Sequence, residues 1–408
     1  MSLNRPISIF HLITTLDTGG TETMLLRLLS SMDRGLFSNQ VISLTDIGSV
    51  GEKLMAQGIP VHTLKMPRGA VTLRGLARLR KIAVILRGLA RLRKILLIQK
   101  PMILQTWLYH GDLFGLIIGK LAGIRFILWN IRCSKMNLKK YPFTTRLAII
   151  LCTIFSSFPE MILTNSLSAR KYHTELGYRA RRWKIIPNGF DCSRFRPDVE
   201  AKAGLLTELG FEGEAESSNA TARNPGGNSS APFLIGFIAR FDPMKDHGTF
   251  IRAACSLLEE KENIHFVLAG KDVASDNRAL TSQIPTRWRD RFHLLGRRDD
   301  IEKVTAALDV ATLSSHGEGF PNIVCEAMAC GIPCVVADVG DSSKIVEDTG
   351  KVVPPGDHQA LKESWKALID MGGGKRKELG VAARKRVERY YELSNIVRQY
   401  EDLYLSLT

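Results

Sequence analysis

The sequence lacks the features that define several protein classes. No apolar stretch reaches the ~20 residues that a membrane-spanning helix needs, because 113–129 is interrupted by charges and 147–158 is too short. No G-x-G-x-x-G stretch is present, which argues against a dinucleotide-dependent dehydrogenase. The first residues, MSLNRPISIFHLITT, contain no small-residue cleavage site, so they predict a first strand and not a secretory signal.

Paired cysteines are also missing. The seven cysteines form no C-x-x-C framework, and an odd number scattered through the chain favours reduced thiols in a cytoplasmic protein. A metal cluster of Cys325, Cys330 and Cys334 is the alternative, but the local sequence places them on a helix and the following strand, where cysteine packs as a small apolar residue. We therefore expect neither a metal nor a cofactor.

Acidic residues are nearly absent from one segment. Residues 53–159 contain nineteen Lys or Arg and a single acid, Asp112, whereas the rest of the chain has 37 basic and 40 acidic residues. Basic residues interleaved with Leu and Ile, and not with aromatics, favour an anionic lipid surface over single-stranded nucleic acid. We predict that the basic region 65–146 contacts an anionic membrane surface and that no nucleic acid is bound. A solvated basic face is the alternative.

The features that are present indicate alternating strands and helices. A length of 408 residues with 45% apolar residues suits two α/β domains. An apolar β-rich run at 7–14 precedes a glycine loop and a helical pattern, and the same order returns from 233–239 onward. Further strands are predicted at 264–269, 292–295, 309–313 and 334–337. This alternation predicts an α/β protein with two parallel, doubly wound domains.

The domain boundary is predicted close to residue 190. The N-terminal domain covers 1–190 and the C-terminal domain covers 191–385, with a terminal helix at 386–408 that packs back on the first domain. The polar stretch 212–230 is predicted to form a mobile surface loop.

A tandem repeat lies within the basic region. The sequence LRGLARLRKI occurs at 73–82 and again at 86–95 and is predicted to be helical. An offset of 13 residues turns the second copy by roughly 220° about a straight helix. The helix is therefore expected to bend near Gly88 or to loop out one copy.

The segment HGEGFPNIVCEAMACGIPCVVAD (316–338) combines acids with an exposed helix start. Asn322 is predicted as the N-cap of a helix that runs through Cys330, and Gly331 ends it. The first backbone N–H groups of such a helix favour a diphosphate. Glu318 precedes the helix, and Glu326 is expected in its first turn.

Glu318, seven intervening residues and Glu326, set in EGFPNIVCEAMACGIPCV, closely resemble the signature of the retaining glycosyltransferase family 4, the group 1 glycosyl transferases. The resemblance implies a GT-B fold, in which two Rossmann-like domains face each other across a cleft. It also implies retention at the anomeric carbon without a metal. By the same resemblance, Glu326 binds the nucleotide ribose hydroxyls and Glu318 lies beside the donor sugar.

Other segments resemble the same family. GFIARFDPMKDHGTF (236–250) resembles its Arg and Lys pair, which implies that Arg240 and Lys245 contact the donor diphosphate; exposed loop charges are the alternative. LDTGGTE (16–22) resembles its glycine loop, and IIPNGFDCSRFRPD (185–198) its interdomain segment. His110 matches a family histidine near the donor sugar. The implied catalytic set is Glu318, His110, Arg240 and Lys245, and the implied donor-binding set is Gly19, Gly20, Arg240, Lys245, Gly319, Phe320, Pro321, Asn322 and Glu326.

The sequence thus predicts a metal-independent hexosyltransferase-type enzyme that moves a sugar from a nucleotide-sugar donor to a lipid-linked acceptor. Its place is the biosynthesis of a cell-surface polysaccharide, lipopolysaccharide or glycolipid, in the cytoplasm at the inner face of the membrane. Two alternatives remain. One is a glycosyltransferase with a soluble acceptor, and the other is a catalytically silent membrane-binding protein of the same fold.

Overall fold

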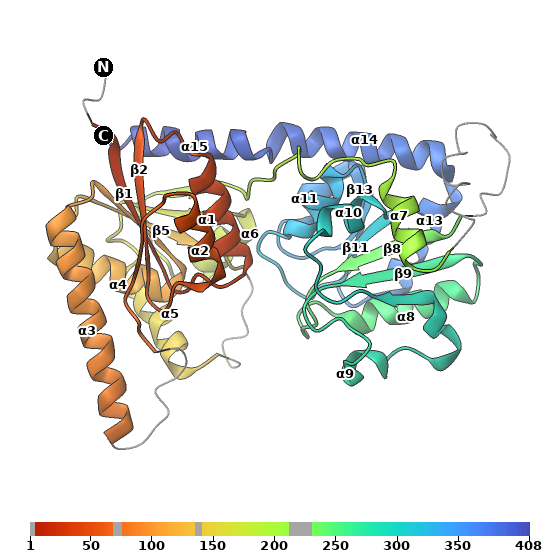
Figure 1. Cartoon of the computed structure of the whole chain (residues 1–408), viewed down its shortest axis with the longest axis horizontal. Coiled ribbons are helices and arrows are strands. Elements are labelled where there is room, and N and C mark those ends of the chain that lie inside the picture. The colour runs from red at the N-terminus through yellow and green to blue at the C-terminus, as the bar shows by residue number, and fades with distance from the viewer. Residues whose placement is uncertain (1–4, 68–75, 135–140, 212–230) are drawn as a thin grey trace. The chain divides into compact units, whose positions relative to one another are not determined.

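The computed structural model describes residues 5–67, 76–134, 141–211 and 231–408, which form two compact units (Figure 1). The first unit comprises Met1–Gly189 and Leu393–Thr408, and the second comprises Phe190–Glu392. Each unit is built on its own parallel sheet, which confirms the predicted α/β class with two doubly wound, Rossmann-like domains. The segment 212–230, predicted as a mobile loop, lies outside the described residues.

The first unit contains a seven-stranded sheet of order β3-β2-β1-β4-β5-β6-β7 with every neighbouring pair parallel. Its central strands are buried on both faces, which explains why they are nearly continuous apolar runs. Its elements are β1 (Ile7–Ile13), α1 (Gly20–Ser31), β2 (Phe37–Ser43), α2 (Gly48–Ala56), β3 (Val61–Thr63), α3 (Leu76–Gln99), β4 (Ile103–Trp107), α4 (Leu108–Leu121), β5 (Phe126–Ile131), α5 (Phe143–Phe155), β6 (Met161–Thr164), α6 (Leu167–Glu175), β7 (Trp183–Ile185) and α15 (Leu393–Leu405).

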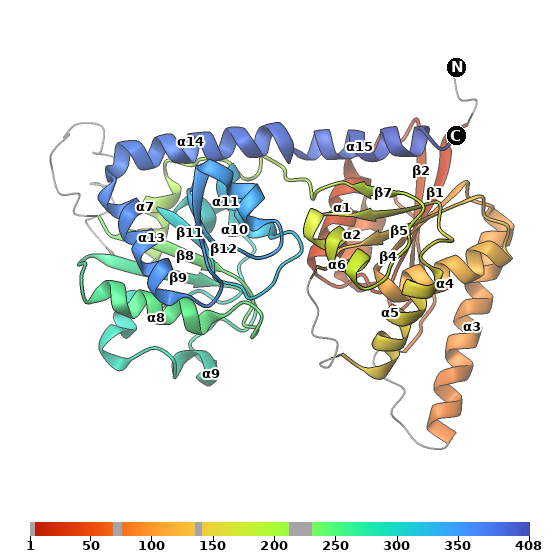
Figure 2. The ribbon, with the colours of Figure 1, turned by 180° about the vertical axis from the view of Figure 1, so that it is seen from behind.

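Helices cover both faces of this sheet. Apolar residues of α1, α2 and α15 form one buried cluster with it, and residues of α3, α4 and α5 form another on the opposite face (Figures 1 and 2). The last helix is tied down by polar contacts as well, because Tyr404 donates to Gln105 at 2.6 Å and the guanidinium of Arg132 donates to the hydroxyl of Tyr400 at 2.6 Å. The C-terminal helix is therefore an integral part of the N-terminal unit.

The second unit contains a six-stranded parallel sheet of order β10-β9-β8-β11-β12-β13. Helices α8 and α13 share one buried cluster with it, and α7, α10, α11 and α14 share the other. Its elements are α7 (Ala201–Glu208), β8 (Phe233–Ile238), α8 (His247–Leu258), β9 (Ile264–Ala269), α9 (Arg278–Thr281), η3 (Thr286–Arg291), β10 (Phe292–Leu294), α10 (Ile301–Ala306), β11 (Val310–Leu313), α11 (Asn322–Ala329), β12 (Cys334–Ala337), α12 (Ser342–Val346), η4 (Glu347–Thr349), β13 (Gly350–Val353), α13 (His358–Asp370) and α14 (Gly372–Tyr390).

The chain enters the second unit at Phe190 and leaves it after Glu392, and these two stretches run side by side. Phe190 donates its backbone N–H to the carbonyl of Tyr391 at 2.9 Å and forms a parallel bridge with Glu392. The predicted C-terminal domain ends at residue 385. In the structure α14 continues to Tyr390 and buries Val387 in the core of the second unit, so residues 386–392 belong there, and only α15 packs on the first unit.

The described part of the duplicated basic segment forms one uninterrupted helix. Helix α3 runs from Leu76 to Gln99 through Gly88, so the second copy does not loop out; residues 73–75 of the first copy lie outside the described residues. Gly88 is buried, and a Cβ at this position would lie 2.6 Å from the methyl carbon of Met66. The glycine thus allows α3 to approach the segment after β3. Within the described ranges, no helix is both long and apolar enough to cross a bilayer.

Buried histidines make the stability of the protein depend on pH. Trp107 donates its indole N–H to Nδ1 of His11 at 3.3 Å, so the proton of the neutral imidazole lies on Nε2, which donates to Asn39 at 3.0 Å. Burial lowers the pKa of His11 to about 4 and has the same effect on the pKa of His173. Burial raises the pKa of Asp112, and this shift has the opposite effect on the pH dependence of the free energy of unfolding.

We expect the free energy of unfolding to increase as the pH rises from about 4 to about 6.5. In this window the unfolded chain binds protons on these histidines and the native chain does not. The protein should be about 2–4 kcal/mol less stable near pH 5 than near pH 7, as measured by urea unfolding. The variant His11→Met should narrow this difference by about 1–2 kcal/mol. An unchanged difference in the variant would show that His11 titrates alike in both states.

Candidate active site

The strand order of the second unit reverses between β8 and β11. In open parallel sheets, ligands bind outside the carboxyl ends of the strands at such a point. The loop after β8 covers 239–246, and the loop after β11 covers 314–321. The two loops are in contact, because His316 donates its backbone N–H to the carbonyl of Met244 at 2.8 Å. Tertiary structure therefore brings together two segments that are about seventy residues apart in the sequence.

An ion pair joins the two loops. The Nζ atom of Lys245 lies 2.5 Å from Oε1 of Glu318, and the side chains are 22% and 12% exposed. The hydroxyl of the buried Ser315 donates to the same carboxylate oxygen at 2.7 Å. Glu318 is thus oriented by two donors while its partner cation remains partly accessible.

Three further residues, Ser314, Asp246 and His316, join the two loops beside this pair. The hydroxyl of Ser314 donates to the carbonyls of Lys245 and Asp246 at 3.1 and 3.0 Å, which ties the end of β11 to the loop after β8. Asp246 has a left-handed φ of +54°, caps α8 by accepting from the N–H of Thr249 at 3.0 Å, and lies 3.1 Å from Nε2 of His316. Backbone strain of this kind persists where surrounding contacts hold it, often at functional sites. No sequence pattern signalled these contacts, since each depends on the register of the two loops.

Arg240 lies on the same loop as Lys245 but is much more exposed. Its side chain is 63% exposed, and its Nε lies 3.2 Å from Asp242. Arg240 and Asp242 attract each other weakly at such exposure, because water screens exposed charges. The Arg240 guanidinium is therefore free to turn toward an anion without a large loss of stability.

The helix after Glu318 begins one residue earlier than expected. Pro321 is the N-cap, and its side chain offers no acceptor to the first N–H groups of the helix. Asn322, predicted as the cap, is the first helical residue. The reason is that the carbonyl of Pro321 accepts from the N–H of Val324 at 3.2 Å, which closes the first turn on the proline. Glu326 consequently lies in the second turn and not the first. Gly331 ends the helix with a φ of +75°, as predicted.

Side chains of the same loop divide between surface and core. Phe320 is buried, stacks on Phe190 with ring centroids 6.1 Å apart and packs edge-on against Tyr391. Its side chain is therefore part of the core, and only its backbone faces the helix start. Asn322 and Glu326 are partly exposed and lie on one face of α11, four residues apart.

Gly340, in the loop after β12, lies against the backbone of the loop that contains Glu318. It has a φ of +62°, and a Cβ at this position would lie 2.4 Å from the carbonyl oxygen of Glu318 and 2.8 Å from that of Gly319. The loop after β12 therefore approaches the Glu318 backbone as closely as only a glycine allows. No sequence pattern points to this residue.

The first unit has its own reversal of strand order, between β1 and β4. His110 lies in the first turn of α4, directly after β4, and burial lowers its pKa. The helix start is pressed against β1, because a Cβ on Gly111 would lie 3.1 Å from the carbonyl oxygen of Leu12. Leu108 adopts a left-handed φ of +68° at this junction, which is rare for a bulky residue. His110 thus stands at the position where parallel sheets bind ligands.

The glycine loop follows β1 at the same edge. Gly19 is the N-cap of α1, with extended backbone, and Gly20 is its first residue. The carboxyl group of the buried Glu22 lies beside them, because a Cβ on Gly19 would meet its Oε2 at 2.4 Å, and burial raises the pKa of Glu22. Gly48, with a φ of +58°, packs against the backbone of Leu16 just before this loop.

The predicted site residues therefore form two groups. Lys245, Glu318, Gly319, Phe320, Pro321, Asn322, Glu326 and Arg240 lie at the switch point of the second unit, whereas Gly19, Gly20 and His110 lie at that of the first.

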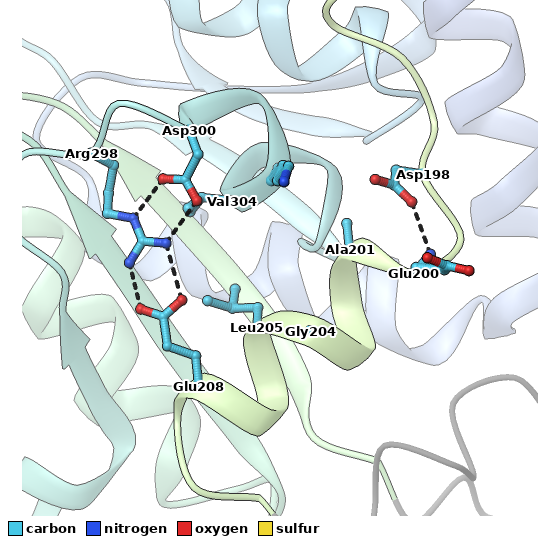
Figure 3. Close-up of a pocket in the computed structure, with 10 residues that line it drawn as sticks. Asp198, Glu200, Ala201, Gly204, Leu205, Glu208, Arg298, Asp300 and Val304 are labelled. Carbon is cyan, nitrogen blue, oxygen red and sulfur yellow. Dashed lines mark hydrogen bonds and ion pairs between the residues drawn. The ribbon is translucent and has the colours of Figure 1, made fainter.

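A separate depression of about 310 Å³ lies between α7 and the start of α10 (Figure 3). Arg298 donates to both carboxylate oxygens of Asp300 at 2.8 and 2.9 Å and forms an ion pair with Glu208, and these hydrogen bonds raise its pKa. Asp198 and Glu200 add two more carboxylates to the lining. This excess of acids makes the depression a poor site for a diphosphate.

The described part of the chain contains no group of three His, Cys, Asp or Glu side chains placed to hold a metal ion. Cys325, Cys330 and Cys334 are buried, and burial raises the pKa of each thiol, as expected for cysteines that pack as apolar residues. Metal independence of any reaction stays a prediction.

Comparison with known proteins finds a family model that matches part of the chain. Residues 232–371, which include Arg240, Lys245, Glu318 and Glu326, match the family model "Glycosyl transferases group 1". The chain is 32% identical over 117 residues to N-acetyl-alpha-D-glucosaminyl L-malate synthase of Bacillus anthracis, an alignment that covers 28% of this chain and 30% of that protein.

A second relative is the UDP-Gal:alpha-D-GlcNAc-diphosphoundecaprenol alpha-1,3-galactosyltransferase of Escherichia coli. It is 29% identical over 168 residues, which cover 40% of this chain and 38% of the relative. The chain thus matches less than half the length of these two curated relatives.

Among solved structures, the chain resembles Anabaena Alr3699/HepE in complex with UDP, with a TM-score of 0.78 and 22% identity over 98% of this chain and 100% of the other. At this level of identity the likeness concerns the fold. Together with the two parallel sheets, it shows that the chain has the GT-B fold that the sequence predicted.

Proposed function

We propose that this protein is a retaining glycosyltransferase that moves a sugar from a nucleotide-sugar donor to a lipid-linked sugar acceptor. The observation that carries the proposal is the pair of Lys245 and Glu318 at the switch point of the second sheet, 2.5 Å apart, beside the start of α11. The segment that matches the group 1 glycosyl transferases contains the whole arrangement. A switch point lined by a cation and a helix start suits the diphosphate of a nucleotide-sugar.

In this proposal the second unit holds the donor. The diphosphate lies against the first N–H groups of α11 and accepts from Lys245, with Arg240 closing over it from the surface. Glu326, on the same face of α11 as Asn322, binds the ribose hydroxyls. A uridine nucleotide is the first candidate, because the similar Anabaena structure contains UDP.

The chemistry then requires stabilisation of a leaving diphosphate. When the bond between the anomeric carbon and the phosphate oxygen breaks, negative charge develops on the diphosphate. In this proposal Lys245, Arg240 and the α11 start stabilise that charge, and no metal ion takes part. Glu318, whose orientation Ser315 sets, lies beside the sugar, where its carboxylate is suited to the positive charge that develops at the anomeric centre.

The first unit contributes the remaining predicted groups. His110 is neutral at neutral pH because burial lowers its pKa, so its ring can accept as well as donate a hydrogen bond to a sugar hydroxyl. Gly20 is exposed at the start of α1, so a ligand can approach its backbone closely, whereas the carboxyl group of Glu22 lies beside Gly19.

A lipid-linked acceptor is proposed because cations dominate the first unit. Residues 53–159 contain nineteen Lys or Arg and a single acid. This excess of positive charge suits an enzyme that works at the anionic inner face of a membrane. The Escherichia coli relative supports this, since its name specifies a diphosphoundecaprenol acceptor. We therefore place the reaction in polysaccharide or glycolipid biosynthesis, with the basic region 65–146 at the membrane surface.

A soluble acceptor is the second candidate. The Bacillus anthracis relative is named for a product built on L-malate, a small water-soluble acid. Activity on a soluble acceptor that is equal with and without vesicles would favour this candidate over the lipid-linked one.

The donor assignment is tested by thermal unfolding with a panel of UDP-, GDP- and ADP-linked sugars. At least one of them should raise the unfolding temperature, because a ligand present at 100 times its Kd stabilises the native state by about 2.7 kcal/mol. Glu326→Ala should weaken this shift, whereas Glu363→Ala, an exposed acid on α13, should leave it unchanged. If no nucleotide-sugar shifts the transition of the unaltered protein, the donor assignment is wrong.

A further inference from the structure

Helix α5 exposes a row of large apolar side chains. Phe143, Leu147, Ile150 and Ile154 are 68%, 42%, 56% and 62% exposed. Their spacing of four, three and four residues places them on one face of the helix. Phe158, just beyond the helix, is 50% exposed and continues the row. Single exposed apolar residues are common in soluble proteins, but a continuous row of this kind marks an interaction surface.

The opposite face of α5 already packs on the protein. Ala148, Ile149 and Cys152 are buried in the cluster that α3, α4 and α5 form with the first sheet. A helix on a protein surface normally turns polar residues outward. In α5 the outward row is apolar instead. One face of the helix packs on the sheet, and no element within the described residues covers the other face.

Helix α4 extends the same surface. Ile117 and Leu121 are 43% and 63% exposed, and α4 packs against α5 on the same face of the sheet (Figure 2). The exposed residues of both helices therefore point away from the sheet. Lys120, Arg125 and Arg146 are exposed basic residues of the same two helices and the turn after α4.

The exposed charges of α3, α4 and α5 are of one sign, and the acid that follows Phe158, Glu160, forms an ion pair with Arg182 at 2.6 Å. Within the described residues between 76 and 155 the single acid is Asp112, which is buried, so every exposed charged side chain there is a cation. These exposed cations are Arg80, Arg87, Arg91, Arg93, Lys94, Lys100, Lys120, Arg125 and Arg146.

The exposed apolar row and the cations around it favour an anionic bilayer over a second copy of the chain as the partner of this surface. A second copy of the chain docked face to face would set two cationic surfaces against each other, and like charges repel. An anionic bilayer accepts apolar side chains below its headgroups and attracts Lys and Arg at its surface, which is the pattern of an interfacial helix.

We propose that α5, with Phe143, Leu147, Ile150 and Ile154 inserted, docks the N-terminal unit on an anionic lipid bilayer, and that α4 lies beside it in the interface. The proposal deepens the proposed function and rests on it for its purpose, because docking would bring the enzyme to a lipid-linked acceptor. It assigns the insertion to apolar side chains of α5 and leaves the basic residues to attract the protein to the surface.

Sedimentation with lipid vesicles tests this with the full chain. The variant Leu147→Ser, Ile150→Ser, Ile154→Ser should bind vesicles of phosphatidylcholine and phosphatidylglycerol at least about tenfold more weakly than the unaltered protein, since each of these side chains would leave hydrocarbon. Arg146→Gln should weaken binding to the same vesicles by about fivefold and should not affect binding to phosphatidylcholine alone.

The matched control removes three exposed valines from the second unit. Val199, Val352 and Val381 are 82%, 41% and 47% exposed, so Val199→Ser, Val352→Ser, Val381→Ser removes a similar kind of surface elsewhere. This variant should bind vesicles like the unaltered protein. Because both sets are on the surface, both variants should fold, which circular dichroism and the donor-induced thermal shift verify.

Three outcomes would overturn the proposal: unaltered protein that does not bind anionic vesicles, an α5 variant that binds as well as the unaltered protein, or a dimer in solution that the α5 variant converts to a monomer. The donor-induced thermal shift distinguishes a failure of the membrane-docking proposal from a failure of the proposed function. A normal donor shift without vesicle binding refutes the docking alone. Vesicle binding that depends on α5, in a protein that shifts with no nucleotide-sugar, supports the docking and refutes the enzyme.

Discussion

Replacing Lys245 with methionine should lower the rate of sugar transfer by about 10²–10³-fold, the size of effect seen when one preorganised donor to a developing charge is removed. Lys245 is the cation in direct contact with Glu318, at 2.5 Å, and in the proposed function it meets the leaving diphosphate. Methionine retains much of the length of the side chain and removes the charge. The loss should appear in kcat as well as in donor affinity, because the charge on the diphosphate grows in the transition state.

Glu318→Gln provides a companion measurement. The amide keeps an oxygen that can accept from the hydroxyl of Ser315, so the loop should keep its shape, while the negative charge beside the sugar is lost. We expect a loss of turnover of about 10²-fold or more with a nearly unchanged donor-induced thermal shift.

The control for both variants is Lys261→Met. Lys261 forms an ion pair of similar length, 2.7 Å with Asp370, but at the surface of the same unit. Turnover in this variant should stay within about twofold of the unaltered protein, since such surface pairs contribute little. Turnover of Lys245→Met within threefold of that of Lys261→Met would refute the assigned role of Lys245.

Replacing Gly380 with alanine should destabilise the protein by about 1–3 kcal/mol, although alanine is the better helix former. Gly380 lies inside α14, and a Cβ there would lie 1.9 Å from the carbonyl oxygen of Gly331. Gly331 ends α11 with a left-handed φ of +75°, so its carbonyl is held in place and α14 must move away. Because α11 carries the helix start of the candidate site, turnover should decrease as well.

Gly374→Ala in the same helix is the matched control. A Cβ on Gly374 would meet no atom within 4 Å, so only the gain in helix propensity remains. We expect this variant to be up to about 1 kcal/mol more stable than the unaltered protein. The two substitutions should therefore move the urea midpoint in opposite directions. Shifts of equal size and sign would show that α14 does not pack on Gly331 as the structure has it.

Much of the fold was predictable because its strands are buried on both faces. The runs at 264–269 and 334–337 are short, apolar and bounded by turn residues, and the structure places β9 and β12 at those same bounds. Element ends were less predictable. The N-cap of α11 is Pro321 and not the predicted Asn322, because a single backbone hydrogen bond from Val324 to the carbonyl of Pro321 decides it. Hydrogen bonds of this kind depend on the loop conformation, which residue types do not specify.

The residues of the candidate site likewise include some that the sequence predicts and some that it does not. Glu318 and Glu326, and Arg240 and Lys245, are named by motifs within short stretches of sequence. Ser314, Ser315 and Gly340 are not, because a hydroxyl at the end of a strand or a glycine in a loop has a role only after another segment is placed against it. Strand order made that placement, since β8 and β11 are neighbours in the sheet although β9 and β10 lie between them in the sequence.

The sequence by itself determined the alternation of strands and helices, the cationic character of residues 53–159, and the segments that carry the chemistry, because each is a property of neighbouring residues. The tertiary structure alone decided that Lys245 touches Glu318 and which face of α5 is covered. Helix α5 is apolar nearly all round, so its sequence would suit a helix buried on every side. Only the packing of Ala148, Ile149 and Cys152 on the sheet leaves Leu147, Ile150 and Ile154 facing outward.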